Sequence, residues 1–486
     1  MDSPPGVTTD RGPTKDPVGR IRSGVWTTAA SAGRHWCVNQ VTTAGGGIIR
    51  ILIVGGGPAG LTAAQRLQRA LRDQLRTGRA QITLVEAAPY LTYRPLLPEV
   101  AAGSVDPRHV VVPLRPALPD CTVLTARISR IDHSRRLAWI APQDGVEVEL
   151  PYDELVLTVG SVSRTRPVPG LAEHGLGFET VGEAVSLRNH VLAQLDLASS
   201  TRDPELRHAA LTFVFVGAGY GGVGALAELE DMARYAIREY PTIQPDDLRW
   251  VLVEATDRIL AEAAPELAAH ALAQLRERNV DVRLSTQLDS AQGLITLSDG
   301  TRFAARTLVW TAGVRPAPLL AATDLPLGAG GRVECLDTLQ VAGPDGRPLP
   351  GAWAAGDCAA VPDPPHGSCP PNAQQALAQA ARLADNLVAV AAGRPAQAYL
   401  PERTLASASL GLHRAVAHTG GRSRTGRRAW LLHRARTLRR LPSTDRRIRV
   451  LADWLLGALF SREVASLAAV EHPRAEFRAA VGEHDH

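Results

Sequence analysis

The sequence predicts an α/β protein that contains two strand–turn–helix units of the same kind. The prediction rests on two glycine-rich turns, at residues 55–60 and 217–222, each placed between a short β-branched strand and a helix. Each unit then continues to a second short strand that ends in a glutamate. With 486 residues, the chain is too long for one compact core, and we expect two or three domains.

The composition is that of an ordinary folded protein rather than a disordered or fibrous one. Hydrophobic residues make up 45% of the chain and charged residues 21%, with a net charge of +4. The five cysteines show neither the paired spacing of a zinc site nor the density of a secreted disulfide scaffold, which favours a reducing cytoplasmic compartment and no bound metal. Residues 1–47 are rich in Pro, Gly, Ser and Thr, and we expect a disordered N-terminal tail.

One apolar stretch, at 209–226, has about the length of a membrane span. Its five glycines are instead typical of a strand followed by a tight turn, a pattern that a spanning helix does not need. The sequence therefore does not predict a transmembrane protein.

The first unit has the features of a Rossmann-like, dinucleotide-binding fold. Its turn follows a β-branched strand at 48–54, a helix is expected over 61–75, and the next strand, at 81–85, ends in a glutamate. Such a turn brings bare backbone amides and a helix N-terminus to a pyrophosphate, and the strand-end carboxylate accepts the ribose hydroxyls. The predicted nucleotide contacts are Gly55, Gly57, Pro58, Ala59, Gly60 and Glu86.

The second unit repeats this construction. A strand at 211–216 leads to the turn, a helix is expected from Val223, and a strand at 250–253 ends in a glutamate. An acid at that position favours NADH over NADPH, although Arg258 nearby weakens the preference. Two dinucleotides held face to face serve hydride transfer from a nicotinamide to a flavin. The predicted contacts of the second nucleotide are Gly217, Gly219, Tyr220, Gly222 and Glu254.

From about residue 48 to residue 477, the chain resembles the two-dinucleotide-binding flavoproteins, and among them the type II NADH dehydrogenases, which are single-subunit NADH:quinone oxidoreductases. The matching segments, besides the first turn, are 95–103 (PLLPEVAAG), 158–160 (TVG), 216–222 (VGAGYGG), 310–313 (WTAG) and 354–357 (AAGD). The resemblance implies FAD and NADH as cofactors. It also implies further cofactor contacts at Thr158, Gly160, Gly313, Gly356 and Asp357, with Asp357 near the ribityl chain and phosphates of the flavin.

The electron acceptor is suggested by the segment 369–379 (CPPNAQQALAQ), which resembles the helix that the family places beside the flavin ring and the quinone. The resemblance implies that Ala373 contacts the flavin and that Gln374 and Gln379 serve catalysis, with Gln379 one place later than usual. The residues alone favour an ordinary Ala-rich helix with Pro in its first turn. The first unit lacks the Cys-x4-Cys pair of disulfide reductases, so electrons are expected to pass directly from the flavin to quinone.

The C-terminal segment, over 410–460 and 472–477, resembles the membrane-attachment region of the family. Thirteen arginines and one acidic residue, Asp445, lie between Arg403 and Arg449, which suits an anionic inner-leaflet surface at the cytoplasmic face of the membrane. Alternatively, the segment packs on the body of the protein or on a second subunit of a homodimer. We do not expect these arginines to bind nucleic acid. The predicted apolar anchors are Trp430, Leu431, Leu432, Trp454, Leu455, Leu456, Leu459 and Phe460.

The second unit departs from the family pattern at Gly224, where the family has a glutamate near the nicotinamide. Glu228 follows one helical turn later and is expected to lie too deep to replace it. Two alternative functions therefore stay open. One is a sulfide:quinone oxidoreductase or another repurposed flavoprotein reductase that uses Cys121, Cys358 or Cys369, and the other is a nucleotide-sensing flavoprotein with little turnover.

The order of the motifs predicts the domain organisation. We expect an FAD-binding domain in two parts, 48–165 and 331–392, with an NAD(P)H-binding domain at 166–330 inserted between them. A membrane-associating or dimerisation segment at 393–486 follows.

Overall fold

The computed structural model describes residues 48–142, 145–328, 330–364, 367–401, 407–419, 422–460 and 462–466. The chain divides into a unit of residues 1–47 and a unit of residues 48–486. The predicted N-terminal tail and the stretch 472–477 lie outside the described residues.

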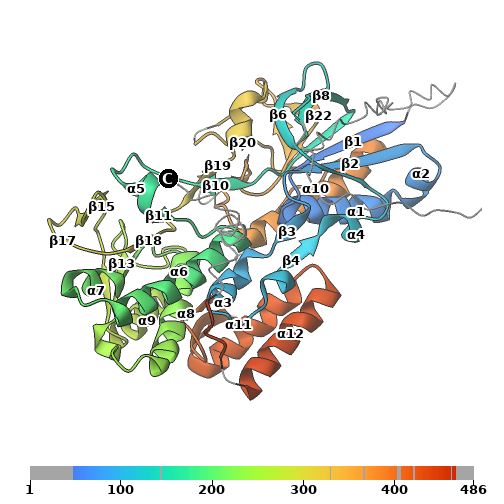
Figure 1. Ribbon diagram of the computed structural model, residues 1–486. Helices are drawn as coiled ribbons and strands as arrows, with labels where there is room; N and C mark the ends of the chain where they lie inside the picture. The colour runs from blue at the N-terminus through green and yellow to red at the C-terminus, as the bar shows by residue number, and fades with distance from the viewer. Residues whose placement is uncertain are drawn as a thin grey trace, which may run out of the picture. The chain divides into compact units, whose positions relative to one another are not determined.

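A six-stranded sheet in the order β21-β22-β9-β1-β2-β5 carries the first glycine turn. Its strands β22, β1 and β2 are labelled in Figure 1. Its strands are parallel except β21, which pairs antiparallel with β22. Residues 340–354, far along the chain, thus complete a sheet begun at residue 49. The strands are β1 Ile49–Val54, β2 Ala80–Glu86, β5 Thr122–Thr125, β9 Glu154–Leu157, β21 Gln340–Ala342 and β22 Pro348–Ala354.

Helix α1, Pro58–Ala70, follows the first turn and packs against α10, Ala373–Ala391. The buried residues of α1 are small or apolar, and the facing side of α10 is rich in alanine and leucine, so the two helices pack closely. The single helix predicted over 61–75 is interrupted at Leu71, after which α2 runs from Arg72 to Arg76.

A second sheet, in the order β11-β18-β12-β13-β14, is parallel throughout. Helix α8 begins at Tyr220, three residues earlier than predicted, because Gly219 is its N-cap. The strands are β11 Gly175–Leu176, β12 Thr212–Val216, β13 Arg249–Val253, β14 Val280–Arg283 and β18 Thr307–Trp310. The helices around them are α6 Val181–Ser200, α7 Pro204–Ala210, α8 Tyr220–Ala236 and α9 Pro265–Glu277.

The apolar stretch at 209–226 is confirmed as a strand, a turn and the start of a helix. Among the helices that the structure describes, none combines the length and the apolar character needed to cross a membrane.

Short elements connect and flank the two sheets. The two-stranded ladder β10–β19 joins them, pairing Ser161 with Pro316. The short strands are β3 Tyr90–Thr92, β4 Val111–Pro113, β6 Arg127–Asp132, β7 Leu137–Ala141, β8 Val148–Pro151, β10 Ser161–Ser163, β15 Leu288–Ser290, β16 Ile295–Leu297, β17 Arg302–Phe303, β19 Val314–Pro316, β20 Val333–Glu334, β23 Ala359–Ala360, β24 Pro362–Asp363 and β25 Gly367–Ser368. The short helices are η1 Arg94–Leu96, α3 Leu97–Ala101, η2 Pro107–His109, α4 Leu114–Ala117, α5 Leu171–His174, η3 Ile237–Glu239, η4 Pro245–Asp247 and η5 Pro318–Ala322.

The C-terminal segment forms a three-stranded sheet and two helices, α11 and α12, which lie side by side (Figure 1). Its sheet packs on α8, and its helices pack near α3, β3 and β4. The elements are β26 Ser407–Ser409, β27 Ala415–Thr419, β28 Arg422–Thr425, α11 Gly426–Arg440 and α12 Thr444–Leu459.

Two of the predicted anchors of this segment face the protein instead of the solvent. Trp430 is 9% exposed, and Trp454 is partly buried with its indole N–H donating to Glu99. The prediction of both as surface anchors is wrong, because both rings enclose the Arg434 guanidinium, at 4.0 and 4.5 Å from their centroids. Leu432 is also partly buried. The exposed anchors are Leu431, Leu455, Leu456, Leu459 and Phe460.

Candidate nucleotide-binding site

The two glycine turns have nearly the same backbone geometry. Gly55 and Gly217 adopt φ values of +102° and +105°, a region that favours glycine. A Cβ on Gly55 would lie 2.4 Å from the carbonyl oxygen of Thr158, and one on Gly217 would lie 2.6 Å from that of Thr311. The first glycine of each turn therefore cannot carry a side chain.

The last glycine of each turn lets the helix approach the strand. A Cβ on Gly60 would lie 1.8 Å from the carbonyl oxygen of Gly55, and one on Gly222 would lie 2.0 Å from that of Gly217. Such overlap is impossible without a backbone shift, so both turns depend on glycine here.

The middle glycines, Gly57 and Gly219, face open space, with no heavy atom within 4 Å of an added Cβ. They are the N-caps of α1 and α8, and neither helix end has a side-chain cap. Pro58, Ala59 and Tyr220 begin the two helices. The N-terminal amides that a helix leaves unpaired thus meet open space, an arrangement that fits a pyrophosphate at each turn.

A threonine holds each turn from the neighbouring strand. The Thr158 hydroxyl lies 3.0 Å from the carbonyl oxygen of Val54 and 2.9 Å from that of Gly55. The Thr311 hydroxyl lies 3.0 and 2.8 Å from the equivalent oxygens of Val216 and Gly217. Sequence reasoning missed Thr311, although the repeated Thr-x-Gly pattern at 158–160 and 311–313 was a signal for it.

Gly160 and Gly313 end these two patterns with positive φ values of 65° and 83° and with open space around the Cβ position. The backbone N–H of Arg164 donates to Gly313, and that of Ala317 donates to Gly160. The β10–β19 ladder thus connects the segments that support the two turns.

The strand-end acids both reach back to the turns. A Glu86 carboxylate oxygen accepts from the Gly56 amide at 2.5 Å, and a Glu254 oxygen accepts from the Ala218 amide at 2.7 Å. Each carboxylate therefore lies beside its turn, where it could accept hydrogen bonds from a ribose diol next to the pyrophosphate. Arg258 donates to the carbonyl of Ala261, so its guanidinium has a local partner other than Glu254.

The end of β22 brings a further acid to the first turn. The Asp357 carboxylate accepts from the Ser161 hydroxyl at 2.7 Å. A Cβ on the neighbouring Gly356 would lie 3.4 Å from the Ala59 Cβ, so this strand end lies against the start of α1. Asp357 therefore follows a strand end that lies beside the start of α1.

The two predicted catalytic glutamines lie at different depths in α10. Gln379 is 2% exposed, and its side-chain oxygen accepts from the Gly356 amide at 2.8 Å. Gln374 is half-buried in the first helical turn, next to the exposed Ala373. The expectation of a proline inside this first turn is wrong, because Asn372 caps the helix through the Gln375 amide and the prolines precede it.

Gly224, the position where the family has a glutamate, lies in the packed contact between α8 and α3. Gly224 is buried in α8, and a Cβ there would lie 3.2 Å from the Pro98 side chain on α3. Glu228 is 2% exposed and accepts from the Ser409 hydroxyl at 2.7 Å, which agrees with the expectation that it lies too deep to replace the acid.

The four cysteines in the described part of the chain are free thiols. Cys335, Cys358 and Cys369 are buried and Cys121 is partly buried. Burial raises the pKa of Cys358 to about 11 and that of Cys121 to about 12, and it raises the pKa of Cys369 as well. The thiolate form that sulfur chemistry requires is therefore disfavoured at neutral pH.

Comparison with known proteins confirms the resemblance drawn from the motifs. A type II NADH:quinone oxidoreductase of Mycobacterium tuberculosis is 28% identical over 431 residues, covering 85% of this chain and 89% of that protein. The structure of NDH2 from Plasmodium falciparum in complex with NADH matches with a TM-score of 0.77 at 15% identity, covering 86% of this chain and 99% of that one. The sulfide:quinone oxidoreductase of Aquifex aeolicus has a TM-score of 0.65 at 16% identity, with coverages of 85% and 96%.

Both structural matches, at these identities, establish the fold alone. Residues 49–380, well over half of the chain, match the pyridine nucleotide-disulphide oxidoreductase family. The paired glycine turns described above lie within the matched region. The chain belongs to the pyridine nucleotide-disulphide oxidoreductase family.

Proposed function

We propose that the protein is an FAD-dependent NADH:quinone oxidoreductase of the type II class. It transfers hydride from NADH to FAD and two electrons from FAD to a membrane quinone, without pumping protons. The observation that carries the proposal is the pair of glycine turns, each open at its middle glycine and each facing a strand-end carboxylate. The M. tuberculosis relative, similar over 85% of this chain, carries the same activity in its name.

The residues divide between the two nucleotides as follows. FAD is bound by a domain of residues 48–165 and 331–392, and NADH by the inserted residues 166–330. The FAD contacts are Gly55, Gly57, Pro58, Ala59, Gly60, Glu86, Thr158, Gly160, Gly356, Asp357 and Ala373. The NADH contacts are Gly217, Gly219, Tyr220, Gly222, Glu254 and Gly313.

The protein's own groups bind and position rather than act as strong acids or bases. Bound FAD would supply the two-electron chemistry. The amides at the start of α1 and α8 hold pyrophosphates, and Glu86 and Glu254 accept ribose hydroxyls. Gln379 accepts from the Gly356 amide beside the first turn. Gln374, in the first turn of the same helix, would contact the quinone.

The C-terminal segment, 393–486, attaches the protein to the anionic inner leaflet at the cytoplasmic face of the membrane. Support comes from the outer side of α12, where Leu455, Leu456, Leu459 and Phe460 are between 54% and 77% exposed. These side chains lie in one arginine-rich region, a combination that suits a helix in the headgroup layer. The same apolar face would also fit a second copy of the chain in a homodimer.

A flotation assay tests this attachment. The protein should float with vesicles that contain anionic lipid and much less with zwitterionic vesicles, and the double variant Leu455→Ser and Leu459→Ser should lose flotation. Leu400→Ser is the matched control, because Leu400 is 79% exposed and lies off these helices. If the double variant floats normally and instead halves the particle mass in light scattering, the face is a dimer interface.

Substrate specificity separates the proposed activity from its rivals. Purified protein should oxidise NADH continuously only when quinone is present, and sulfide should not replace NADH. Cys358→Ser should leave this activity unchanged, since Cys358 is fully buried and its thiol pKa is about 11. Quinone reduction by sulfide that disappears in Cys358→Ser would favour the sulfide:quinone oxidoreductase. Flavin reduction without reoxidation by quinone would favour the nucleotide sensor.

A further inference from the structure

Two carboxylates that the proposed mechanism does not use are buried where the C-terminal segment meets the body. Glu99 lies on α3 and is 4% exposed, and Glu228 lies on α8 and is 2% exposed. They are close enough that the charge of Glu99 raises the pKa of Glu228. Burial of two neighbouring acids is costly unless each is paired or protonated.

In the described part of the chain, all the polar partners observed for this pair lie in the C-terminal segment. Glu99 accepts from the Arg434 guanidinium at 3.1 Å and from the Trp454 indole N–H. Glu228 accepts from the Ser409 hydroxyl at 2.7 Å, and its other oxygen lies 3.8 Å from Arg462. Undocking of the segment would therefore remove these partners from both acids and open the acids to water.

The pair also adjoins the helix that begins at the second glycine turn. Pro98, the neighbour of Glu99, packs against Gly224 of α8, one turn before Glu228 on the same helix. The N-cap of α8 is Gly219, the open glycine of the turn. The docking of the C-terminal segment and the placement of this turn thus depend on the same helix.

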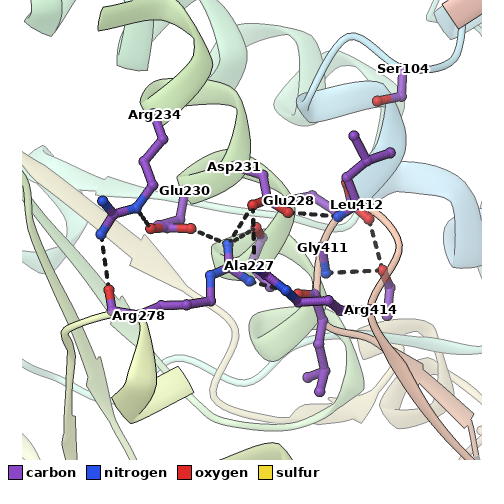
Figure 2. A network of polar contacts seen from close by, with 12 residues as sticks. Ser104, Ala227, Glu228, Glu230, Asp231, Arg234, Arg278, Gly411, Leu412 and Arg414 are labelled. Carbon is purple, nitrogen blue, oxygen red and sulfur yellow. Dashed lines mark hydrogen bonds and ion pairs between the residues drawn. The ribbon is translucent and has the colours of Figure 1, made fainter. Parts of the chain in front are cut away.

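The C-terminal half of α8 forms further ion pairs with its surroundings, shown in Figure 2. Glu230 is paired with Arg234 and Arg278, so its charge is neutralised by two arginines. Asp231 lies 3.0 Å from Arg278 and 3.8 Å from Arg414, and it also accepts from the Leu412 amide. These acids have close cationic partners.

Glu228 is less well neutralised than its neighbours. The Arg462 guanidinium also donates to the Ser104 hydroxyl at 2.9 Å, and Arg434 is paired with Glu99. Burial, followed by the charge of Glu99, raises the pKa of Glu228 to about 7. His413, whose ring lies tilted against that of Trp430, has its pKa lowered by burial and adds no positive charge at neutral pH.

We propose that Glu228, with Glu99 beside it, is a positioning residue whose protonation couples the docking of the C-terminal segment to the placement of helix α8. The effect on NADH rests on the proposed function, whereas the proton-dependent docking does not. When the segment is docked, Glu228 is buried and holds a proton that it would lose to water once the segment had separated. Reciprocally, anything that fixes α8, such as a bound nucleotide, strengthens docking.

The direction of the pH dependence follows from the raised pKa. The pKa of Glu228 is about 7 when docked against an ordinary value of 4.5. Its contribution to docking is fully present below the ordinary value and is lost as the pH rises through 7. Between pH 6 and pH 8.5, the docking equilibrium should weaken by about tenfold.

Limited proteolysis of the full-length, flavin-loaded protein tests the coupling without relying on activity. Trypsin cleaves after the arginines of α11 and α12, and the cleavage rates of wild type and Glu228→Gln are compared at each pH, so that the pH dependence of trypsin itself cancels. Gln is a neutral isostere that still accepts from Ser409. The ratio of the wild-type rate to the variant rate should rise about tenfold from pH 6 to pH 8.5.

The matched control is Glu266→Gln, an exposed acid in the first turn of α9, which should show no such change in ratio. A second variant, Glu99→Gln, removes the neighbouring charge and should move the wild-type transition to lower pH. A constant ratio for Glu228→Gln, or an unmoved transition in Glu99→Gln, would overturn the proposal. A purely structural role would accelerate cleavage equally at every pH.

The kinetic consequence separates this proposal from the proposed function. The KM for NADH should rise several-fold in wild type between pH 6 and pH 8.5 and stay flat in Glu228→Gln, with kcat changing less. A KM that rises equally in both proteins would overturn the link to α8. A protein that never oxidises NADH but shows the expected proteolysis would retain the proton-dependent docking and lose the proposed function.

Discussion

The two glycine-turn units share their turns but differ in what supports them. In both, a left-handed glycine, an open glycine and a close-packed glycine are held by a threonine hydroxyl and faced by a strand-end glutamate. Behind the first turn, α1 packs through small and apolar side chains on α10. Behind the second, α8 carries three buried or nearly buried acids, Glu228, Glu230 and Asp231, tied by hydrogen bonds and arginines.

The comparison teaches that turn geometry and helix support are separable. The turns follow from local steric rules at a few glycines, so the same construction recurs with little variation. The supports come from distant parts of the chain, residues 373–391 in one case and Arg278 with residues 409–462 in the other. We expect the first unit to respond to changes in packing and the second to respond to pH as well.

The largest effect should come from adding a side chain at the last glycine of each turn. Ala at position 60 or 222 would place a Cβ about 2 Å from a carbonyl oxygen, and the backbone must shift. Gly60→Ala should be purified without flavin, whereas Gly222→Ala should keep its flavin and bind NADH at least a hundredfold more weakly. Flavin absorbance and NADH titration measure the two outcomes.

The control for these variants is Gly457→Ala, in an exposed part of α12 where an added Cβ meets open space. It should retain both nucleotides. If Gly60→Ala holds FAD as tightly as wild type, the first turn is not the flavin site.

The next largest effect concerns the support of α8. Gly224→Glu would force a side chain and a charge against Pro98 and should lower the free energy of unfolding by roughly 3 kcal/mol. Urea unfolding measures it. Gly221→Glu, on the same helix but in open space, should unfold like wild type. Equal stability of the two variants would contradict the packing explanation for Gly224.

A smaller and reciprocal effect is expected at the strand-end acids. Glu254→Gln should raise the KM for NADH about tenfold, because one charge-assisted hydrogen bond to a ribose is lost. The flavin content should stay unchanged. Glu86→Gln should weaken flavin retention and leave the KM for NADH unchanged. A variant that alters the other unit's nucleotide would show that the two assignments are exchanged.

The smallest effect should come from the two supporting threonines. Thr158→Val and Thr311→Val each remove a hydroxyl that donates to turn carbonyls and should cost about 1 kcal/mol of unfolding free energy. Thermal unfolding is measured with either nucleotide added. FAD should raise the unfolding temperature of Thr158→Val less than that of Thr311→Val, and NADH should raise that of Thr311→Val less than that of Thr158→Val. If each nucleotide stabilises both variants equally, the assignment of Thr158 to the FAD turn and Thr311 to the NADH turn would be contradicted.

The parts of the fold that could be predicted from the sequence are local. The strands at 49–54 and 212–216, the turns and the acids at 86 and 254 follow from short patterns whose geometry is sterically constrained. Thr311 was available from the same reasoning, because its Thr-x-Gly pattern repeats that of Thr158. Thr158 was predicted from the family resemblance, whereas the pattern alone does not show that the Thr311 hydroxyl holds a turn.

The contacts that could not be predicted are those between distant segments. Glu99 and Arg434 are far apart in the chain, and nothing in their neighbourhoods indicates that they pair. Trp430 and Trp454 occur in helices with apolar residues on both sides, so periodicity does not show which side is inward. The structure resolves this because the two rings enclose Arg434 against the body.

The most direct test of the central claim is an anaerobic reaction of the purified protein, followed through the colour of its flavin. NADH should bleach the flavin quickly, NADPH should do so much more slowly, and a soluble quinone added afterwards should restore the colour. This result would establish an NADH:quinone oxidoreductase that works without an acid at Gly224. Failure of both nucleotides to bleach the flavin would contradict the account and leave the reductant unassigned.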